Sequence, residues 1–308
     1  MPKIFQTTIT KSVSISGIGL HSGAESTIKI LPAEANSGII FKRVDLKNNN
    51  FVKANYQNVT SAKLCTTLEN NFGVKISTVE HLLAALYLAE IDNVLIEINS
   101  EEVPILDGSA KNFLDIFKNL EIKTLSDKKK YFRVTKKVEL IDGDKRISIE
   151  PSDDSLEVEF QLNYENKVIG KQKNLINFSK DSIDDVSNSR TFCLLQDIEK
   201  IKKLGLAKGG SLDNAVVVDN DKVLNECGLR NKKEFVNHKI LDLVGDFMLS
   251  GFRIFGKVKC YQGGHLLTNM FLRKLLNSTK LENNKKPEKF TISKSINREP
   301  PIKIAINA

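Results

Sequence analysis

Hydrophobic and polar residues alternate along the first part of the chain. The alternating stretches are Phe5 to Ile15, Ser26 to Leu31 and Gly38 to Val44, with Gly, Pro, Ala and Asn between them. A period of two residues is typical of strands with one buried face, and the residues in between favour turns. The pattern therefore predicts strands of an antiparallel sheet at the start of the protein.

The period then changes to that of a helix. Apolar residues recur at helical spacing at Val79, Leu82, Leu83 and Leu86. Ser77 and Glu80 have the Ser-x-x-Glu spacing of a capping box, which marks helix N-termini. His81 is therefore predicted to lie near the start of a helix. A strand over 94–98, a turn over 104–108 and a second helix over 110–120 are predicted next.

The second half of the chain begins in the same way. Strands are predicted over 131–140, 146–149 and 156–162, followed by helices over 194–204 and 233–250 and a strand over 252–261. Strands followed by a histidine-bearing helix thus occur once in each half. This order predicts an α+β protein made of two related domains that face one another.

The predicted elements suggest a division of the chain. A first domain is expected over 1–125, a Lys-rich linker over 126–130, a second domain over 131–275 and a C-terminal tail over 276–308. The tail is rich in Asn, Lys and Pro, so it is expected to be partly extended, with one further strand over 289–293.

Composition fits a globular protein. Of the 308 residues, 41% are hydrophobic and 27% are charged, which is enough apolar material for a core. No run approaches the roughly 18 apolar residues of a membrane span, and residues 1–10 lack the apolar core of a secretory signal. A cytoplasmic location is therefore expected. The widely spaced cysteines are interpreted as reduced, buried thiols: Cys65, Cys193, Cys227 and Cys260.

The formal net charge of +8 does not select a partner, because a positive surface attracts nucleic acid, anionic lipid and phosphorylated small molecules alike. Part of the excess lies in Lys128, Lys129 and Lys130, which are expected to be solvated. With no Trp, few Tyr and no aromatics interleaved with basic residues, a nucleic-acid partner is not expected. A peripheral contact with the inner membrane surface stays open, and a monomer is expected.

Two predicted helices carry candidate metal ligands. On the later one, His238, Asp242 and Asp246 fall within roughly 80° of one another around the helix axis. A solvated polar face is the alternative interpretation of this stripe. Together with His81, however, His238 and Asp242 offer two imidazoles and one carboxylate, the three-ligand set of a catalytic zinc site. His81, His238 and Asp242 are the predicted ligands, with Fe²⁺ as an alternative metal.

Three further residues are candidates for acid–base roles beside the metal. Glu80 precedes His81 and is the candidate general base for a metal-activated water, although the capping box is its other possible role. Asp246 is a candidate to orient a liganding imidazole, or else a surface carboxylate. His265 follows Gly263 and Gly264, which let the backbone approach a ligand closely, and it could protonate a leaving amine. An ordinary turn or buried histidine is the alternative.

These residues stand in a series of motifs, in order, between about residues 5 and 275. The motifs are Gly19-Leu20-His21-Ser22-Gly23, Thr78-Val79-Glu80-His81-Leu82-Leu83-Ala84-Ala85-Leu86, Asp92-Asn93, Pro104-Ile105-Leu106-Asp107-Gly108-Ser109-Ala110, Ser189-Arg190-Thr191-Phe192, Gly209-Gly210-Ser211-Leu212-Asp213-Asn214-Ala215, His238-Lys239-x-x-Asp242-x-x-x-Asp246 and Gly264-His265-x-x-x-Asn269. The series resembles the UDP-3-O-acyl-N-acetylglucosamine deacetylase family. Where many members carry Gly after Arg-Thr-Phe, this chain has Cys193.

The resemblance implies a fold and a reaction. The fold is two α+β domains, each a β-sheet layered with helices, with the helices sandwiched between the sheets and the active site at the domain interface. The reaction is hydrolysis of the N-acetyl group of UDP-3-O-[(R)-3-hydroxyacyl]-N-acetylglucosamine, the committed step of lipid A biosynthesis. It also implies that His81, His238 and Asp242 bind zinc, that Glu80 is the general base and that His265 is the general acid.

Further roles are implied by the same resemblance. Thr191 would help to stabilise the oxyanion, and Asp246 would support His265. Lys239 and Phe192 would contact the UDP-sugar substrate. An insertion near 193–208 would form an apolar passage for the acyl chain, although core packing of a short amphipathic helix is the alternative. The predicted passage residues are Ile198, Leu204 and Leu206. For His21, contact with the substrate and a role only in holding its loop together both stay open.

Two other classes compete with this interpretation. A zinc peptidase is one, but the His-Glu-x-x-His helix common in such enzymes is absent from the sequence. A structural protein with an incidental metal is the other. Turnover and its dependence on metal distinguish these classes from a deacetylase.

Overall fold

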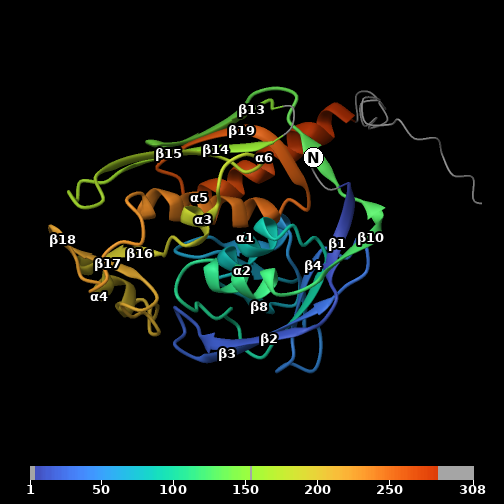
Figure 1. Ribbon diagram of the computed structural model, residues 1–308, viewed down its shortest axis with the longest axis horizontal. Coiled ribbons are helices and arrows are strands. Elements are labelled where there is room, and N and C mark those ends of the chain that lie inside the picture. The colour runs from blue at the N-terminus through green and yellow to red at the C-terminus, as the bar shows by residue number, and fades with distance from the viewer. Residues whose placement is uncertain (1–3, 153–154, 284–308) are drawn as a thin grey trace, which may run out of the picture.

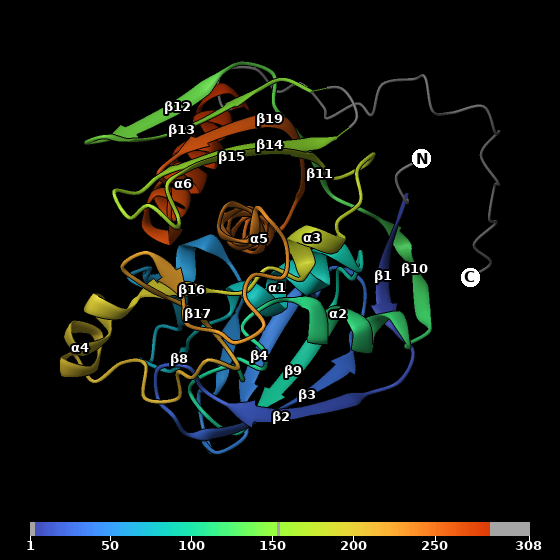
Figure 2. The ribbon, with the colours of Figure 1, turned by 60° about the vertical axis from the view of Figure 1, so that its left-hand side comes forward.

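The protein folds as two β-sheets with a layer of helices between them (Figure 1, Figure 2). The structure is a computed structural model, and it describes residues 4–152 and 155–283. The first sheet comes from the N-terminal half of the chain and the second from the C-terminal half. The expected α+β class, with helices sandwiched between two sheets, is therefore confirmed.

The first sheet contains one parallel pair of strands. Its strands lie in the order β2 (Val13–Ile18), β3 (Glu25–Pro32), β9 (Val94–Ile98), β4 (Ile39–Arg43) and β5 (Phe51–Lys53). β9 runs antiparallel to β3 but parallel to β4, because the chain reaches β9 through a long connection that includes a helix. Alternate residues such as Ile28, Ile30 and Ile96 point inward and are fully buried.

The second sheet repeats this topology. Its strands lie in the order β12 (Val138–Asp142), β13 (Lys145–Glu150), β19 (Arg253–Tyr261), β14 (Leu156–Asn163) and β15 (Lys171–Asn177), and β11 (Tyr131–Arg133) also pairs with β19. In each sheet the strand that comes last in the sequence lies in the middle, β9 between β3 and β4 and β19 between β13 and β14, antiparallel to the first neighbour and parallel to the second. Both sheets are therefore mixed, and the expectation of an antiparallel sheet is wrong in this respect.

The helices of both halves meet in the layer between the sheets (Figure 2). They are α1 (Glu80–Leu88), α2 (Lys111–Lys118), α3 (Asp184–Ser187), α5 (Glu234–Met248) and α6 (His265–Asn283). α5 packs against α1 of the other half, against α3 and α6, and against β14 and β15. Every residue of α5 is buried except Lys239 and Met248. Its polar stripe therefore faces protein on all sides.

Smaller strand groups flank the layers (Figure 1). At one end of the molecule, β1 (Phe5–Ile9) pairs with β10 (Ile122–Lys128). At the other end, β16 (Phe192–Leu194), β17 (Val216–Asp219) and β18 (Lys222–Val223) form a small sheet beside α4 (Leu195–Lys203). The segment before α1 forms a 3-10 turn, η1 (Tyr56–Asn58), and a three-stranded group of β6 (Val59–Ser61), β7 (Thr67–Glu69) and β8 (Lys75–Ile76).

Two predictions in the first half are wrong in detail. The stretch from Phe5 to Ile15 divides between β1 and β2, which belong to different sheets. The capping box is not formed: Val79 occupies the cap position without a side-chain hydrogen bond, and the hydroxyl of Ser77 donates to the carbonyl of Glu101 instead. The carboxylate of Glu80 is therefore available for another role.

The segment expected as a solvated linker is ordered. β10 extends to Lys128, and the next residue, Lys129, is buried. Its Nζ lies 3.0 Å from Oδ2 of Asp92 and 3.2 Å from the carbonyl oxygen of Glu90. Arg253 of the second half forms an ion pair with the other oxygen of Asp92. The connection between the halves is thus fixed to both of them.

The C-terminal part also differs from expectation. α6 continues past Leu276 to Asn283, so the beginning of the expected extended tail is helical. The strand expected over 289–293 lies outside the described residues. All four cysteines are free; Cys65 and Cys260 are buried as expected, but Cys227 is exposed.

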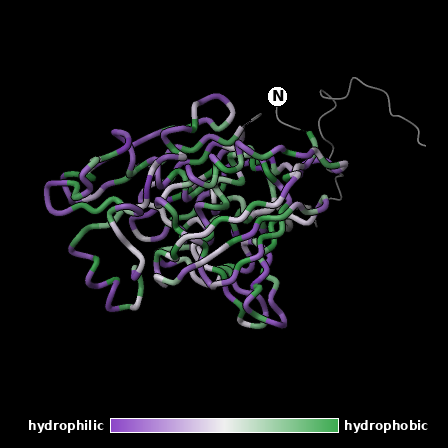
Figure 3. The backbone as a smooth tube through the Cα atoms, turned by 60° about the horizontal axis from the view of Figure 1, so that its bottom comes forward, coloured by the Kyte–Doolittle hydropathy of each residue, from purple (hydrophilic) through white to green (hydrophobic). Residues whose placement is uncertain are grey.

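The core follows the two inner sheet faces and the helix layer, and hydrophilic segments gather in the outer loops (Figure 3). Fully buried aromatic side chains from both halves belong to this one core, among them Phe41, Phe113, Phe235 and Phe271. In the parts of the chain that the structure describes, no helix combines the length and the apolar character needed to cross a membrane.

Candidate metal centre and active site

The candidate site lies where α1 of the first half crosses α5 of the second. His81 sits in the first turn of α1, whereas His238 and Asp242 are one turn apart on α5. The two helices approach closely, because Gly245 of α5 lies against the backbone of Glu80. Side chains separated by about half the chain therefore meet inside the helix layer.

The structure brings the three predicted metal ligands together. Nε2 of His81 lies 3.5 Å from Oδ1 of Asp242, and Nε2 of His238 lies 3.3 Å from the same oxygen. One ligand atom from each residue lies within 4.8 Å of the others. The three residues are 4%, 1% and 4% exposed, so they form a compact group shielded from water.

This group fits a tetrahedral metal ion. Ligand distances of about 2.0–2.1 Å in a tetrahedron separate neighbouring ligand atoms by about 3.3–3.4 Å. The separations from Asp242 Oδ1 to His238 and His81 are 3.3 and 3.5 Å. That oxygen is buried and accepts no hydrogen bond from the described residues. A buried carboxylate oxygen without a donor is costly unless a cation satisfies it, so the group can hold a metal ion.

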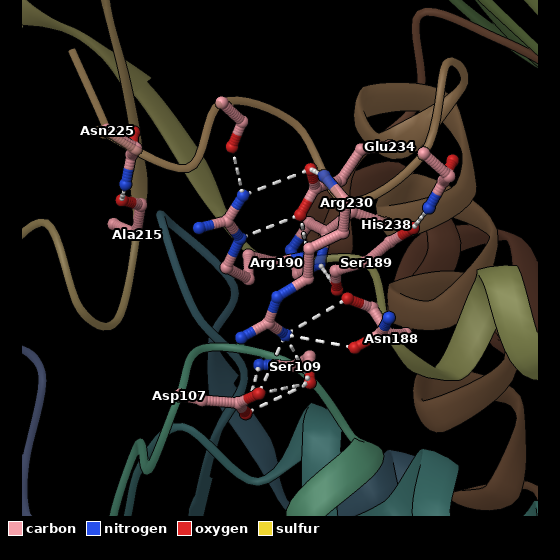
Figure 4. A network of polar contacts seen from close by, with 12 residues as sticks. Asp107, Ser109, Asn188, Ser189, Arg190, Ala215, Asn225, Arg230, Glu234 and His238 are labelled. Carbon is pink, nitrogen blue, oxygen red and sulfur yellow. Dashed lines mark hydrogen bonds and ion pairs between the residues drawn. The ribbon is translucent and has the colours of Figure 1, made fainter. Parts of the chain in front are cut away.

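Neighbouring groups prepare these side chains for metal binding. Nδ1 of His238 lies 3.1 Å from the carbonyl oxygen of Ser189 (Figure 4), which favours the tautomer that leaves the Nε2 lone pair free. Burial lowers the pKa of His238 to about 3, so this histidine is neutral. Burial acts to raise the pKa of Asp242, but His238, Lys239 and His265 lower it well below its usual value. Lys239 donates to Oδ2 of Asp242 at 2.8 Å.

A network of ion pairs and hydrogen bonds fixes the segment next to Ser189 (Figure 4). Oε1 of Glu234 accepts from Nε of Arg190 at 2.8 Å and from its backbone N–H at 3.1 Å. The other oxygen of Glu234 accepts from the backbone N–H of Arg230 at 2.7 Å. The guanidinium of Arg230 reaches Oδ2 of Asp107 in the first half, also at 2.7 Å. The network therefore fixes the Ser189 carbonyl relative to both halves.

Glu80 and His265 lie next to the metal-binding group. Nε2 of His265 is 3.6 Å from Oε1 of Glu80 and 3.8 Å from Oδ2 of Asp242. Nδ1 of His265 is 2.8 Å from Oδ2 of Asp246. Glu80, His265 and Asp246 are all buried. The predicted base, the predicted acid and its supporting carboxylate are therefore adjacent.

The electrostatics of this pair suit acid–base chemistry. Burial raises the pKa of Glu80, against the opposing influence of His265 and His81. For His265, burial acts to lower the pKa, but the carboxylates of Asp246, Glu80 and Asp242 raise it to about 10. His265 thus holds its proton at neutral pH, while Glu80 binds protons more readily than an exposed glutamate does.

Two alternatives from the sequence are wrong: a solvated polar face on α5 and a turn position for His265. The polar stripe of α5 is not a solvated face, since His238, Asp242 and Asp246 are at most 4% exposed. His265 is the first residue of α6 and is buried, so a turn position for this histidine is wrong. Gly263 is required for packing rather than for bending, because a Cβ there would overlap the sulfur of Cys260.

Two of the predicted substrate residues adjoin the metal-binding group. The ring of Phe192 lies 6.2 Å from the ring of His238, and Nζ of Lys239 lies 5.6 Å from the centre of the Phe192 ring. Thr191 is two residues from Ser189 and is tied to the first half, because its N–H donates to the carbonyl of Gly108 at 2.8 Å.

The predicted acyl-passage residues lie on and after α4, at one end of the molecule (Figure 2). Ile198 and Leu206 are half-buried, and Leu204 is 62% exposed. No residue of α4 itself is buried, so the alternative of core packing is wrong for this helix.

His21 lies in a loop of the first half that also contacts the second half. Its backbone N–H donates to Glu102, and its carbonyl accepts from the N–H of Lys208 in the second half. Both ring nitrogens are buried without a hydrogen-bond partner among the described residues. Burial lowers the pKa of His21. Its role stays open.

Three acidic or hydroxyl-bearing residues near the site were not predicted. Glu102 accepts a hydrogen bond from the backbone of His21, and Glu234 accepts one from Arg190. Thr66 donates hydrogen bonds to Glu80 and Asp246. Thr66 and Glu80 are 14 residues apart, and the other partners lie 44 to 180 residues away. Local sequence spacing therefore could not predict these contacts.

Fold and site together define an α+β protein of two similar halves, with a buried His–His–Asp group that can hold a metal ion and a carboxylate–imidazole pair at the interface of the halves. Residues 6–277 match the family model described as LpxC, UDP-3-O-acyl N-acetylglycosamine deacetylase. The chain belongs to this family.

Individual relatives match along almost the whole chain. The UDP-3-O-acyl-N-acetylglucosamine deacetylase of Geotalea uraniireducens is 44% identical over 273 residues, 88% of either chain. Those of Mannheimia succiniciproducens and Pasteurella multocida are each 43% identical, over 278 and 276 residues, which cover 89% of this chain and 90% of the relative. The resemblance inferred from the motifs is therefore confirmed.

Proposed function

We propose that this protein hydrolyses the N-acetyl group of UDP-3-O-[(R)-3-hydroxyacyl]-N-acetylglucosamine, with acetate and the free amine as products, in lipid A biosynthesis. The observation that carries the proposal is the meeting of Glu80, His265 and the His–His–Asp group in one buried site, in a chain of the deacetylase family. We also propose that the protein works in the cytoplasm, with domains over 1–125 and 131–275.

Zinc is the proposed metal at His81, His238 and Asp242, with Fe²⁺ as the alternative at this ligand set. A divalent metal bound there supplies Lewis-acid polarisation of the amide carbonyl and lowers the pKa of water. Glu80 accepts a proton from the attacking water, whose oxygen bonds to the acetyl carbon. The raised pKa of Glu80 supports this role, because a general base works best with a pKa near the working pH.

Collapse of the tetrahedral intermediate breaks the carbon–nitrogen bond, and the amine nitrogen then needs a proton. His265 donates it from Nε2, the nitrogen that faces Glu80. Asp246 accepts from Nδ1 and stabilises the protonated ring. Thr191 is the proposed oxyanion donor, supported by its position two residues from the Ser189 carbonyl that contacts His238.

The substrate is proposed to extend from the metal-binding group in two directions. Lys239 and Phe192 contact the UDP-sugar, a proposal supported by their positions beside His238. The acyl chain runs along α4 toward Leu204, whose open apolar side chain suits a lipid better than water. Ile198 and Leu206 complete the proposed passage.

The direct test is to incubate the purified, metal-loaded protein with UDP-3-O-(3-hydroxyacyl)-N-acetylglucosamine and to detect both products, the free amine and acetate. UDP-N-acetylglucosamine, which lacks the acyl chain, serves as the matched control and should react far more slowly. Release of neither product by a metal-loaded sample contradicts the proposed reaction. Equal turnover of the two compounds contradicts only the acyl passage.

A further inference from the structure

Thr66 links the two carboxylates of the candidate acid–base pair. It precedes β7 and is 2% exposed. Its backbone N–H donates to Oε2 of Glu80 at 3.1 Å, and its hydroxyl donates to Oδ1 of Asp246 at 2.7 Å. Glu80 belongs to the first half of the chain and Asp246 to the second. One residue therefore bonds to a carboxylate on each side of the interface.

The remaining oxygen of each carboxylate faces His265. Oδ2 of Asp246 lies 2.8 Å from Nδ1, and Oε1 of Glu80 lies 3.6 Å from Nε2. Thr66, Glu80, His265 and Asp246 thus form a closed ring of buried contacts. Asp246 is hydrogen-bonded at both oxygens, and Glu80 is hydrogen-bonded at one oxygen and close to the imidazole at the other, so the ring of contacts orients both carboxylates relative to His265.

The backbone next to Thr66 has an unusual conformation and is hydrogen-bonded to the start of α1. Leu64 has a φ of 71°, a left-handed conformation that is uncommon for a residue other than glycine. Such a conformation persists where the surrounding structure requires it. Cys65 is buried, and the carbonyl of Thr66 accepts from the N–H of Val79 at 3.5 Å, directly before Glu80. The segment is therefore anchored at the start of α1.

Building on the proposed function, we propose that Thr66 is a positioning residue for the deacetylation. Its hydroxyl holds Asp246 so that Nε2 of His265 points at the leaving amine, and its amide holds Glu80 so that Oε1 points at the attacking water. A general acid and base must lie within hydrogen-bond reach of the atoms that they serve, and errors of about 0.5 Å or 10–20° impair them. Thr66 acts through these two side chains.

Two substitutions separate positioning from packing. Thr66→Val keeps the shape of the side chain but removes the hydroxyl, whereas Thr66→Ser keeps the hydroxyl and removes the methyl group. For Thr66→Val we expect kcat to fall by about 10- to 100-fold, part of the 10²–10⁴ that acid–base catalysis typically contributes. KM and metal content should not change. Thr66→Ser should retain most of the activity, because the bond to Asp246 is kept.

Thr67→Val is the matched control. It removes the neighbouring hydroxyl, which lies 3.9 Å from the sulfur of Cys65, and should leave kcat near the wild-type value. The proton on Nδ1 of His265 supplies a readout that needs no turnover. Its downfield NMR resonance in the metal-loaded protein should shift or broaden in Thr66→Val but not in Thr66→Ser.

The proposal is overturned if Thr66→Val is as active as wild type, or if Thr66→Ser is the more impaired variant, which is the order that packing alone gives. An unchanged His265 resonance in Thr66→Val also overturns it. If the wild-type protein releases no acetate, the proposed function fails instead, and the His265 resonance still decides whether Thr66 orients this ring.

Discussion

A Cβ on Gly245 would overlap the carbonyl oxygen of Glu80. Glycine within a helix costs about 1 kcal/mol relative to alanine, so its presence in the middle of α5 needs a reason. The close crossing of α1 and α5 provides one. Because His81 follows Glu80, this contact sets the distance between His81 and the two ligands on α5.

Gly245→Ala should therefore separate the two helices. Overpacking of a buried contact destabilises by about 1–3 kcal/mol, and the longer distance from His81 to Asp242 should weaken metal retention. Thermal unfolding and bound metal after dialysis measure the two effects. Gly210→Ala is the control, because a Cβ there meets only ordinary contacts, the nearest at 3.4 Å. Wild-type stability and metal content in Gly245→Ala would contradict the explanation.

Glu80 and His238 should behave differently on truncation. Glu80→Ala should keep its metal but lose about 10²- to 10⁴-fold in turnover, the usual contribution of a general base. His238→Ala should lose both, since it removes a proposed ligand. Metal content by elemental analysis and acetate release, measured on the same samples, separate the two roles. Full activity in Glu80→Ala would exclude it as the base.

The alkaline limb of the pH profile should report His265. The proposed acid works protonated, so activity is lost as the pH rises through its pKa, which Asp246, Glu80 and Asp242 raise to about 10 against the effect of burial. A bound cation at Asp242 lowers that pKa, which places the limb of the loaded protein below 10. Asp246→Asn removes the largest raising influence.

For Asp246→Asn we therefore expect the alkaline limb of kcat/KM to move to lower pH by about one pH unit or more. His265→Gln is the companion variant and should lack this limb. A limb at the wild-type position in Asp246→Asn would mean that another group titrates there.

The Arg190–Glu234 pair should matter for stability. Removing one partner of a buried ion pair leaves the other charge unpaired, so Glu234→Ala should destabilise the fold by about 3–5 kcal/mol. Lys173→Ala is the control, because Lys173 is exposed and its surface ion pair with Glu159 is worth about 0–1 kcal/mol. Chemical denaturation measures both. Equal effects of the two substitutions would contradict the structural role of Glu234.

Periodicity predicted the elements that carry the site. The helical spacing around His81 and His238 and the strand over 94–98 follow from local patterns, and α1, α5 and β9 are found there. The parallel pairing of β9 with β4 was not predictable in this way, because the order of strands in a sheet depends on contacts between distant segments.

The supporting residues of the site escaped prediction for the same reason. Ser77 and Glu80 have capping-box spacing, yet Glu80 bonds to Thr66 and faces His265. Lys129 looks like part of a solvated run but forms a buried ion pair with Asp92. A short motif shows which chemical groups are present, whereas tertiary packing determines which residues they contact.

The most direct measurement is acetate release before and after the metal is removed with a chelator and then restored with about one equivalent of zinc, the stoichiometry of a single three-ligand site. We predict that activity disappears, that it returns with the metal, and that His238→Ala regains none. Undiminished acetate release by a sample verified to be free of metal would contradict a metal-dependent site at His81, His238 and Asp242.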